Sequence, residues 1–142
     1  GPPSHPFYPE GVVLAYLRHP ELRTGLMTPA LAANPDEQAR MAEMVGLDRL
    51  ARVDEVLGYK AIPVPEVTPG EPSPQPVTTV CAQVVLNGEA QPERRWLLFT
   101  PEYQPPLLDP PTPDRLYIAN VNAIPAPSEG AGLRCEQMID AQ

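Results

Sequence analysis

The chain has 142 residues, the size of one ordinary domain, and 22 of them are proline, roughly three times the usual share. Its net charge of −8 and its single lysine, Lys60, argue against nucleic acid and against an anionic membrane surface as partners, because binding to phosphates needs clustered basic side chains. No apolar run approaches the roughly 20 residues of a membrane-spanning helix, so we expect no integral membrane segment.

The first third of the sequence predicts helices that follow an extended arm. Residues 1–9 are rich in proline and should form this arm. From Pro9 the apolar residues recur at helical spacing until Pro20 interrupts them, and a second short helix is expected after that proline. The third helix has the clearest ends, because Asn34 is suited to cap its first turn and Gly46 is suited to terminate it.

The stretch Leu47–Leu57 fits two kinds of structure. Its apolar residues recur at helical spacing, but from Val53 onward the pattern is equally compatible with a strand, and residues 59–67 have an extended pattern. Pro63 and Pro65 each lack a backbone donor, so a strand there belongs at the edge of a sheet or at a bulge. The sequence leaves helix and strand open for residues 47–58.

Three later segments predict β-strands, at residues 77–86, 94–100 and 115–124, because β-branched and aromatic residues are frequent in them. Proline-rich residues 68–76 and 101–114 should form stiff loops between strands. Helices followed by sequential antiparallel strands predict an α+β fold. We expect N-terminal helices packed on one face of a curved antiparallel sheet of three to four strands, with proline-rich loops.

We expect a single α+β domain at residues 10–124, followed by a polar tail at residues 125–142. The two cysteines, Cys81 and Cys135, lie in an apolar strand and in this tail. A disulfide between them would pin the tail to the sheet and would indicate an oxidising compartment, that is, a periplasmic, cell-surface or secreted protein. There are two alternatives to the disulfide: both cysteines are buried free thiols, or one of them is a reactive thiol.

The sequence contains no recognisable catalytic or metal-binding motif, so we predict no catalytic residue, no metal and no cofactor. Neither His5 nor His19 has a second histidine at metal-binding spacing. The adjacent acids Asp54 and Glu55 are the pair best suited to general acid–base chemistry. Solvated charges at a strand edge are the simpler interpretation of this pair.

Four residues are candidates for a ligand pocket between helices and sheet: Tyr59, Trp96, Tyr117 and Asn120. Trp96 and Tyr117 fit an ordinary core equally well. Asn120 and Asn122 are unusual in a strand, where asparagine is depleted. If they face inward, they need hydrogen-bond partners and suit the floor of a polar pocket. An exposed Asn120 would argue against this pocket.

Residues 10–33, which contain the run Glu-Gly-Val-Val-Leu-Ala-Tyr-Leu, are similar to the opening helices of secreted or lipid-anchored members of one α+β group. The strand Val77–Leu86 and the stretch Arg95-Trp96-Leu97-Leu98 resemble the central sheet of the same group. This is the cystatin-like roll of nuclear transport factor two and ketosteroid isomerase, and the resemblance covers residues 10–124. It implies helices packed on a curved sheet, and members include isomerases, ligand binders and interaction domains.

Our first functional hypothesis is a non-enzymatic extracytoplasmic binding or interaction domain, because stiff proline-rich loops lose little entropy on binding. The second is a small-molecule-binding or isomerase-like enzyme with a pocket between helices and sheet. The third is a structural subunit in which an edge strand near Val64 pairs with another chain, although Pro63 and Pro65 disfavour this pairing.

Overall fold

The chain folds into helices and one four-stranded antiparallel sheet, as predicted, in a computed structural model that describes residues 9–58, 79–105, 107–108, 111–112, 115–124 and 134–140. The helical elements are α1 (Pro9–Arg18), α2 (Pro29–Ala32), α3 (Pro35–Val45), α4 (Cys135–Asp140) and short 3-10 turns at Pro20–Leu22, Thr24–Leu26 and Leu47–Arg49. The strands are β1 (Leu50–Gly58), β2 (Val80–Leu86), β3 (Glu93–Gln104), β4 (Leu107–Leu108), β5 (Pro111–Thr112) and β6 (Arg115–Ile124).

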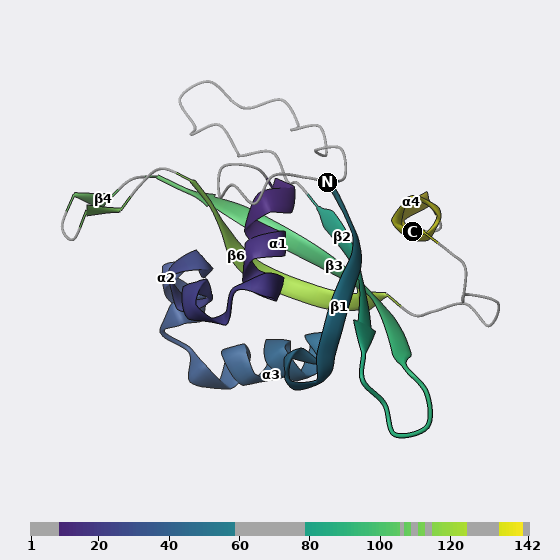
Figure 1. Cartoon of the computed structure of the whole chain (residues 1–142). Helices are drawn as coiled ribbons and strands as arrows, with labels where there is room; N and C mark the ends of the chain where they lie inside the picture. Colours follow the sequence, from purple (N-terminus) through teal and green to yellow (C-terminus); the bar gives the residue numbers. More distant parts are fainter. Residues whose placement is uncertain are drawn as a thin grey trace.

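The strands of the main sheet follow the order β1-β2-β3-β6, so β1 and β6 are its two edges (Figure 1). Each neighbouring pair is antiparallel, and a connection of residues 87–92 joins β2 to β3 as a hairpin. The β6 edge is partly covered, because Met27 forms a bridge with Ile118 and the Thr28 amide donates to the Ile118 carbonyl at 2.9 Å.

Alternation along the strands separates the sheet into two faces. On the first, which we call the helix face, Val80, Ala82 and Val84 of β2 pack under the N-terminal helices. Helix α1 contacts all four strands of the sheet, and every residue from Gly11 to Leu17 is buried. A helix that is apolar on all sides has to be buried, and packing of α1 against the sheet buries it. Figure 1 shows α1, α2 and α3 on one side of β1 and α4 on the other.

Helix α3 begins and ends where the sequence predicts. The Asn34 Oδ1 accepts a hydrogen bond from the Glu37 amide at 3.1 Å, which satisfies one free donor of the first turn. At the other end, Gly46 has a left-handed backbone with φ of 80°. The Arg95 guanidinium from β3 donates to the carbonyls of Met44 and Glu43, so the sheet also holds the end of this helix.

We expect Gly46→Ala to lower the free energy of unfolding by about 1–3 kcal/mol, because a residue with a Cβ is strained at positive φ. The added Cβ would also collide with the Leu86 Cδ1, and Leu86 is fully buried. Gly25→Ala is the matched control, since a Cβ there meets no atom within 4 Å. Urea denaturation of both variants measures the difference, and equal stabilities would contradict this account.

The ambiguous stretch 47–58 forms a 3-10 turn and then strand β1. Pairing with β2 decides the outcome, because Leu50 lies opposite Leu86 and Val53 lies opposite Val84. The register shifts between Leu50 and Arg52 and again between Val53 and Glu55, so β1 carries two bulges. Residues 59–78, which include the predicted extended segment and the first proline-rich loop, lie outside the described residues, as does the arm at residues 1–8.

The second face, which we call the disulfide face, carries the predicted Cys81–Cys135 disulfide, whose Cα atoms lie 5.7 Å apart. Trp96 and Ile124 are buried against it. Part of the tail at residues 125–142 is helical, since α4 begins at Cys135 and contacts β1 and β2. The disulfide confirms the predicted pinning of the tail, whereas the helix in it was not predicted.

The predicted loop at residues 101–114 is wrong in part. Strand β3 continues to Gln104, and Pro101 lies at a register shift against β6. A bulge accommodates a proline because it removes the need for one ladder donor. Beyond β3, strands β4 and β5 form a separate small hairpin, in which Leu108 is almost fully exposed. This hairpin projects from the body of the molecule in Figure 1.

Candidate functional site

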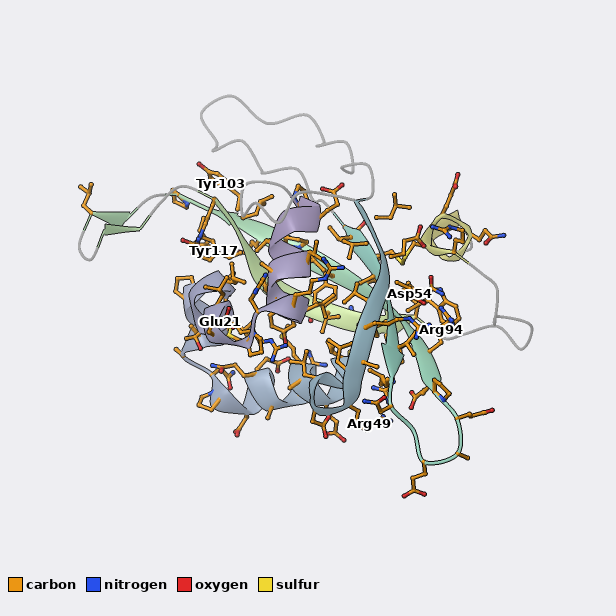
Figure 2. The ribbon with its side chains drawn as sticks, viewed as in Figure 1. Glu21, Arg49, Asp54, Arg94, Tyr103 and Tyr117 are labelled. Atoms are coloured by element: carbon orange, nitrogen blue, oxygen red, sulfur yellow. A yellow bond between two sulfur atoms is a disulfide. The ribbon has the colours of Figure 1, made fainter. Side chains whose placement is uncertain are left out.

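The acids Asp54 and Glu55 of β1 both lie on the disulfide face. Strict alternation would put them on opposite faces, but the bulge between Val53 and Glu55 breaks the alternation. Asp54 accepts hydrogen bonds from Arg52 Nε at 2.6 Å and from Arg94 Nη1 at 2.7 Å. Figure 2 shows Asp54 and Arg94 next to each other beside β1. The Asp54 carboxylate is therefore held by two guanidinium groups.

These contacts change the acidity of Asp54. The hydrogen bond from Arg52 lowers its pKa, burial raises it by less, and the Arg94 hydrogen bond lowers it further. Glu93 is held in the same way, since the hydrogen bond from Arg95 and then that from Arg49 outweigh burial and lower the pKa of this carboxyl. A general base near neutral pH needs a raised carboxyl pKa, so the direction of these shifts favours a structural role.

We predict that acid weakens the fold in part through Asp54. A carboxyl with a lowered pKa in the folded state stabilises the protein above its unfolded pKa of about 4, and this stabilisation is lost as the pH falls through the folded value. The Asp54→Asn variant should therefore have a lower Tm than the wild type at pH 7, and the difference should shrink below about pH 4. Thermal melts across this range test it; a constant difference would contradict it.

Glu55 attaches the C-terminal helix to β1. Its Oε1 accepts a hydrogen bond from the Cys135 amide at 2.7 Å, and its Oε2 pairs with the Arg134 guanidinium at 3.2 Å. The Gln137 side chain accepts from the Arg134 amide at 2.8 Å, so two amides at the start of α4 are satisfied by side chains. Only 15% of the Glu55 side chain is exposed, against 71% for Arg134. Arg134 is thus held at the surface beside β1.

A groove follows the outer edge of β1. One hollow of about 360 Å³ is lined by Leu14 and Arg18 of α1, by residues 53–56 of β1, and by Arg134. A second, of about 390 Å³, is lined by α1 and by residues 50–53. Both are lined by Arg18 and Val53, so the two hollows are adjacent along β1. We call this feature the β1 groove: β1 is its floor, α1 is one wall, and Arg134 is on the other side.

The outer edge of β1 is free of main-chain pairing within the described residues. Strand β1 pairs with β2 on one side, and no other described main-chain group bonds to its outer edge. In a strand, alternate residues direct their N–H and C=O groups toward each side. Within the described residues, the floor of the β1 groove therefore carries backbone donors and acceptors that have no main-chain partner on this side.

The predicted pocket residues do not meet in one cavity. Trp96 is buried on the disulfide face, and its Nε1 has no hydrogen-bond partner among the described residues. Tyr117 is buried under the Arg115 guanidinium, 4.7 Å from the ring centroid. Tyr117 pairs with Glu102 of β3, which lies six residues from Trp96, so Trp96 and Tyr117 are roughly 20 Å apart. Figure 2 shows Tyr117 far from Asp54. Tyr59 lies outside the described residues.

Asn120 and Asn122 are exposed, whereas Ile118 and Ile124 are buried. The register against β3 shifts at Pro101, and this shift puts Ile118 in the core of the helix face and Ile124 in that of the disulfide face. The Asn120 Oδ1 accepts a long hydrogen bond from Arg40 at 3.4 Å. Asn120 therefore does not form the floor of a buried pocket.

The sequence indicated Asp54 and Glu55 as site candidates but did not indicate Arg18 or Arg134. Arg18 could not be predicted as a site residue because a basic residue in the last turn of a helix has an ordinary role there. Arg134 could not be predicted because only the disulfide and Glu55 bring it close to β1. The described residues include no group of three or more His, Cys, Asp or Glu side chains that is able to hold a metal ion.

Within the described part of the chain, no helix combines the length and the apolar character needed to cross a bilayer. Comparisons with protein-family models, with curated proteins and with solved structures found no match.

Proposed function

We propose that this chain is a non-enzymatic extracytoplasmic interaction domain that binds a protein partner in the β1 groove. The observation that carries the proposal is the outer edge of β1, which lies at the floor of a groove and pairs with no strand of the described residues. Unpaired strand edges are the surfaces on which extended peptides add as a further strand. Natural proteins usually cover or shorten such an edge, so an edge that has no main-chain partner among the described residues and that lies between α1 and Arg134 is suited to recognition.

The charges at the groove support binding rather than catalysis. The acids that line it are already used, because Asp54 binds two arginines and Glu55 binds the start of α4. Such contacts hold the two carboxylates in fixed positions, which suits a rigid binding surface. Rigid surfaces lose less entropy when a partner binds.

The extracytoplasmic part of the proposal is supported by the Cys81–Cys135 disulfide, because structural disulfides persist in oxidising compartments. Alkylation of the protein taken from the cell that makes it tests this part. We expect both cysteines to resist alkylation until a reductant is added. Immediate alkylation of both thiols would contradict the compartment. We also propose that the chain has the cystatin-like roll, although that fold alone assigns no activity.

Selection from a library of random peptides, followed by mapping of the amide resonances, tests the interaction directly. We expect selected peptides to shift the resonances of Leu50–Gly58 and of α1, and to leave those of α3 unchanged. Helix α3 is a suitable internal reference because it contacts β6 at the other edge of the sheet. A library that yields no peptide shifting β1 would overturn the proposed function.

A further inference from the structure

We infer that the partner in the β1 groove is a short extended segment with acidic side chains, which adds to β1 as a fifth strand. This inference rests on the proposed function and specifies the chemistry of the partner. Backbone pairing with the free edge of β1 would supply the attachment, and the exposed arginines along the groove would select acidic residues.

The shape of the edge limits the length of the partner. Bulges between Leu50 and Arg52 and between Val53 and Glu55 interrupt the regular spacing of main-chain groups. Such bulges disfavour long, flat pairing between sheet edges, including pairing with a second copy of this chain. The regular stretch Glu55–Gly58 is left as the main pairing segment, followed by side-chain contacts toward Arg52 and Arg18. A short segment with a few paired residues fits this edge.

The charges of the groove differ from those of the whole molecule. The chain carries a net charge of −8, yet three arginines and two carboxylates line the two hollows. The arginines are the more exposed: Arg52 by 59% and Arg134 by 71%, against 25% for Asp54 and 15% for Glu55. Arg18 is exposed and forms no ion pair within the described residues. The face that a partner meets is therefore positive.

The distribution of charge along the groove also sets where the acidic residues of the partner belong. The Glu10 carboxylate lies against Gly58, so closely that a Cβ on Gly58 would collide with its Oε1. This end of the groove would repel an acidic side chain. Arg18 and Arg52 lie at the opposite end, beside Leu50. We therefore expect the acidic side chains of the partner to lie over residues 50–55, with uncharged ones beside Gly58.

Backbone pairing is tested with a synthetic peptide of about eight alternating glutamate and valine residues. Two further versions carry N-methyl groups on alternate residues, one version on the odd residues and the other on the even. A strand that adds to β1 uses the N–H groups of one side only, so one version should bind about tenfold or more weakly than the other. Calorimetric affinities that are equal for both versions would overturn strand addition.

Charge selection is tested by reversing the charge of Arg18, a change that removes no ion pair with the described residues. Arg18→Glu should weaken binding of the peptide by about tenfold, because repulsion replaces attraction, whereas Arg18→Lys should retain most of the affinity. Arg40→Glu is the control for the charge change, since it makes the same change on α3, where it also removes the ion pair with Glu37. A lysine–valine peptide should bind more weakly than the glutamate–valine peptide. If Arg18→Glu and Arg40→Glu bind alike, the inference is wrong.

Two other outcomes separate this inference from the proposed function. Selected library peptides that shift β1 but carry no excess of acidic residues would overturn the acidic partner and leave the interaction domain intact. If sedimentation of the free protein reveals a dimer that Arg18→Glu dissociates, the groove is occupied by a second copy of this chain. That result would likewise overturn the inference that the partner is an acidic segment. A monomer that binds the glutamate–valine peptide supports the inference.

Discussion

Loss of the Cys81–Cys135 disulfide should lower the free energy of unfolding by about 4 kcal/mol in the chain-entropy model, because the bond closes a long loop in the unfolded chain. The sequence separation of 54 residues sets this magnitude. The bond also anchors α4, so its loss should release the packing of Trp96 and Ile124 on the disulfide face. The Cys81→Ala and Cys135→Ala double variant, measured by urea denaturation, tests the prediction.

The wild-type protein with a reductant is the companion measurement, because it keeps both cysteine side chains. The double variant and the reduced protein should lose similar stability. They should also increase the exposure of Trp96, which tryptophan fluorescence reports, while the helices on the other face persist. A loss below about 1 kcal/mol would contradict the role of the disulfide as the main attachment of the tail.

Phe99→Ala should lower the free energy of unfolding by about 3–5 kcal/mol, since it removes a large, fully buried side chain from the helix face. The Phe99 ring meets Tyr16 of α1 edge to face, with ring centroids 5.8 Å apart. This contact joins the first helix to β3, so the cavity would lie at the junction of the two layers. Arg23 lies over the Tyr16 ring, 5.6 Å from its centroid, and its Nε donates to the Tyr16 backbone carbonyl at 2.6 Å.

Phe99→Leu is the control for the Phe99→Ala measurement, because it retains most of the apolar volume and should cost much less. The difference between the two variants isolates the cavity at the Tyr16 contact. If Phe99→Ala costs no more than Phe99→Leu, the helices do not depend on this contact and the packing described for α1 is wrong.

Local signals made much of the fold predictable. Asn34 and Gly46 define α3 through caps that depend only on neighbouring residues. The apolar residues from Val80 to Leu86 predict a strand, which is also a local signal. The last strand spans the predicted residues. The order of these segments then suffices for the α+β class.

Contacts between distant residues decided what the sequence left open. The stretch 47–58 fits helix and strand equally in isolation, and pairing with β2 selects the strand. Helix α4 is too short to be stable alone, and it depends on Glu55, about 80 residues away, and on the disulfide. Bulges at Asp54 and near Pro101 change which face a side chain occupies, and periodicity cannot reveal them.

The same limits apply to the candidate site. The pair Asp54 and Glu55 was visible in the sequence, but the arginines that flank β1 come from α1 and from the start of α4. Their proximity exists only after the sheet and the disulfide have formed. The predicted pocket grouped aromatic and asparagine residues because of their chemical type, which does not show where they lie in the fold. The register shift at Pro101 leaves Asn120 exposed.

Hydrogen exchange of the β1 amides, with and without the glutamate–valine peptide, tests most directly whether the free edge of β1 is a binding site. In the free protein, amides that face β2 should exchange slowly and those on the outer edge should exchange fast. The account predicts that the peptide slows the outer-edge amides of Leu50–Gly58 and leaves those of α3 unchanged. Unchanged β1 exchange in the presence of a bound peptide would place the binding site elsewhere and contradict the account.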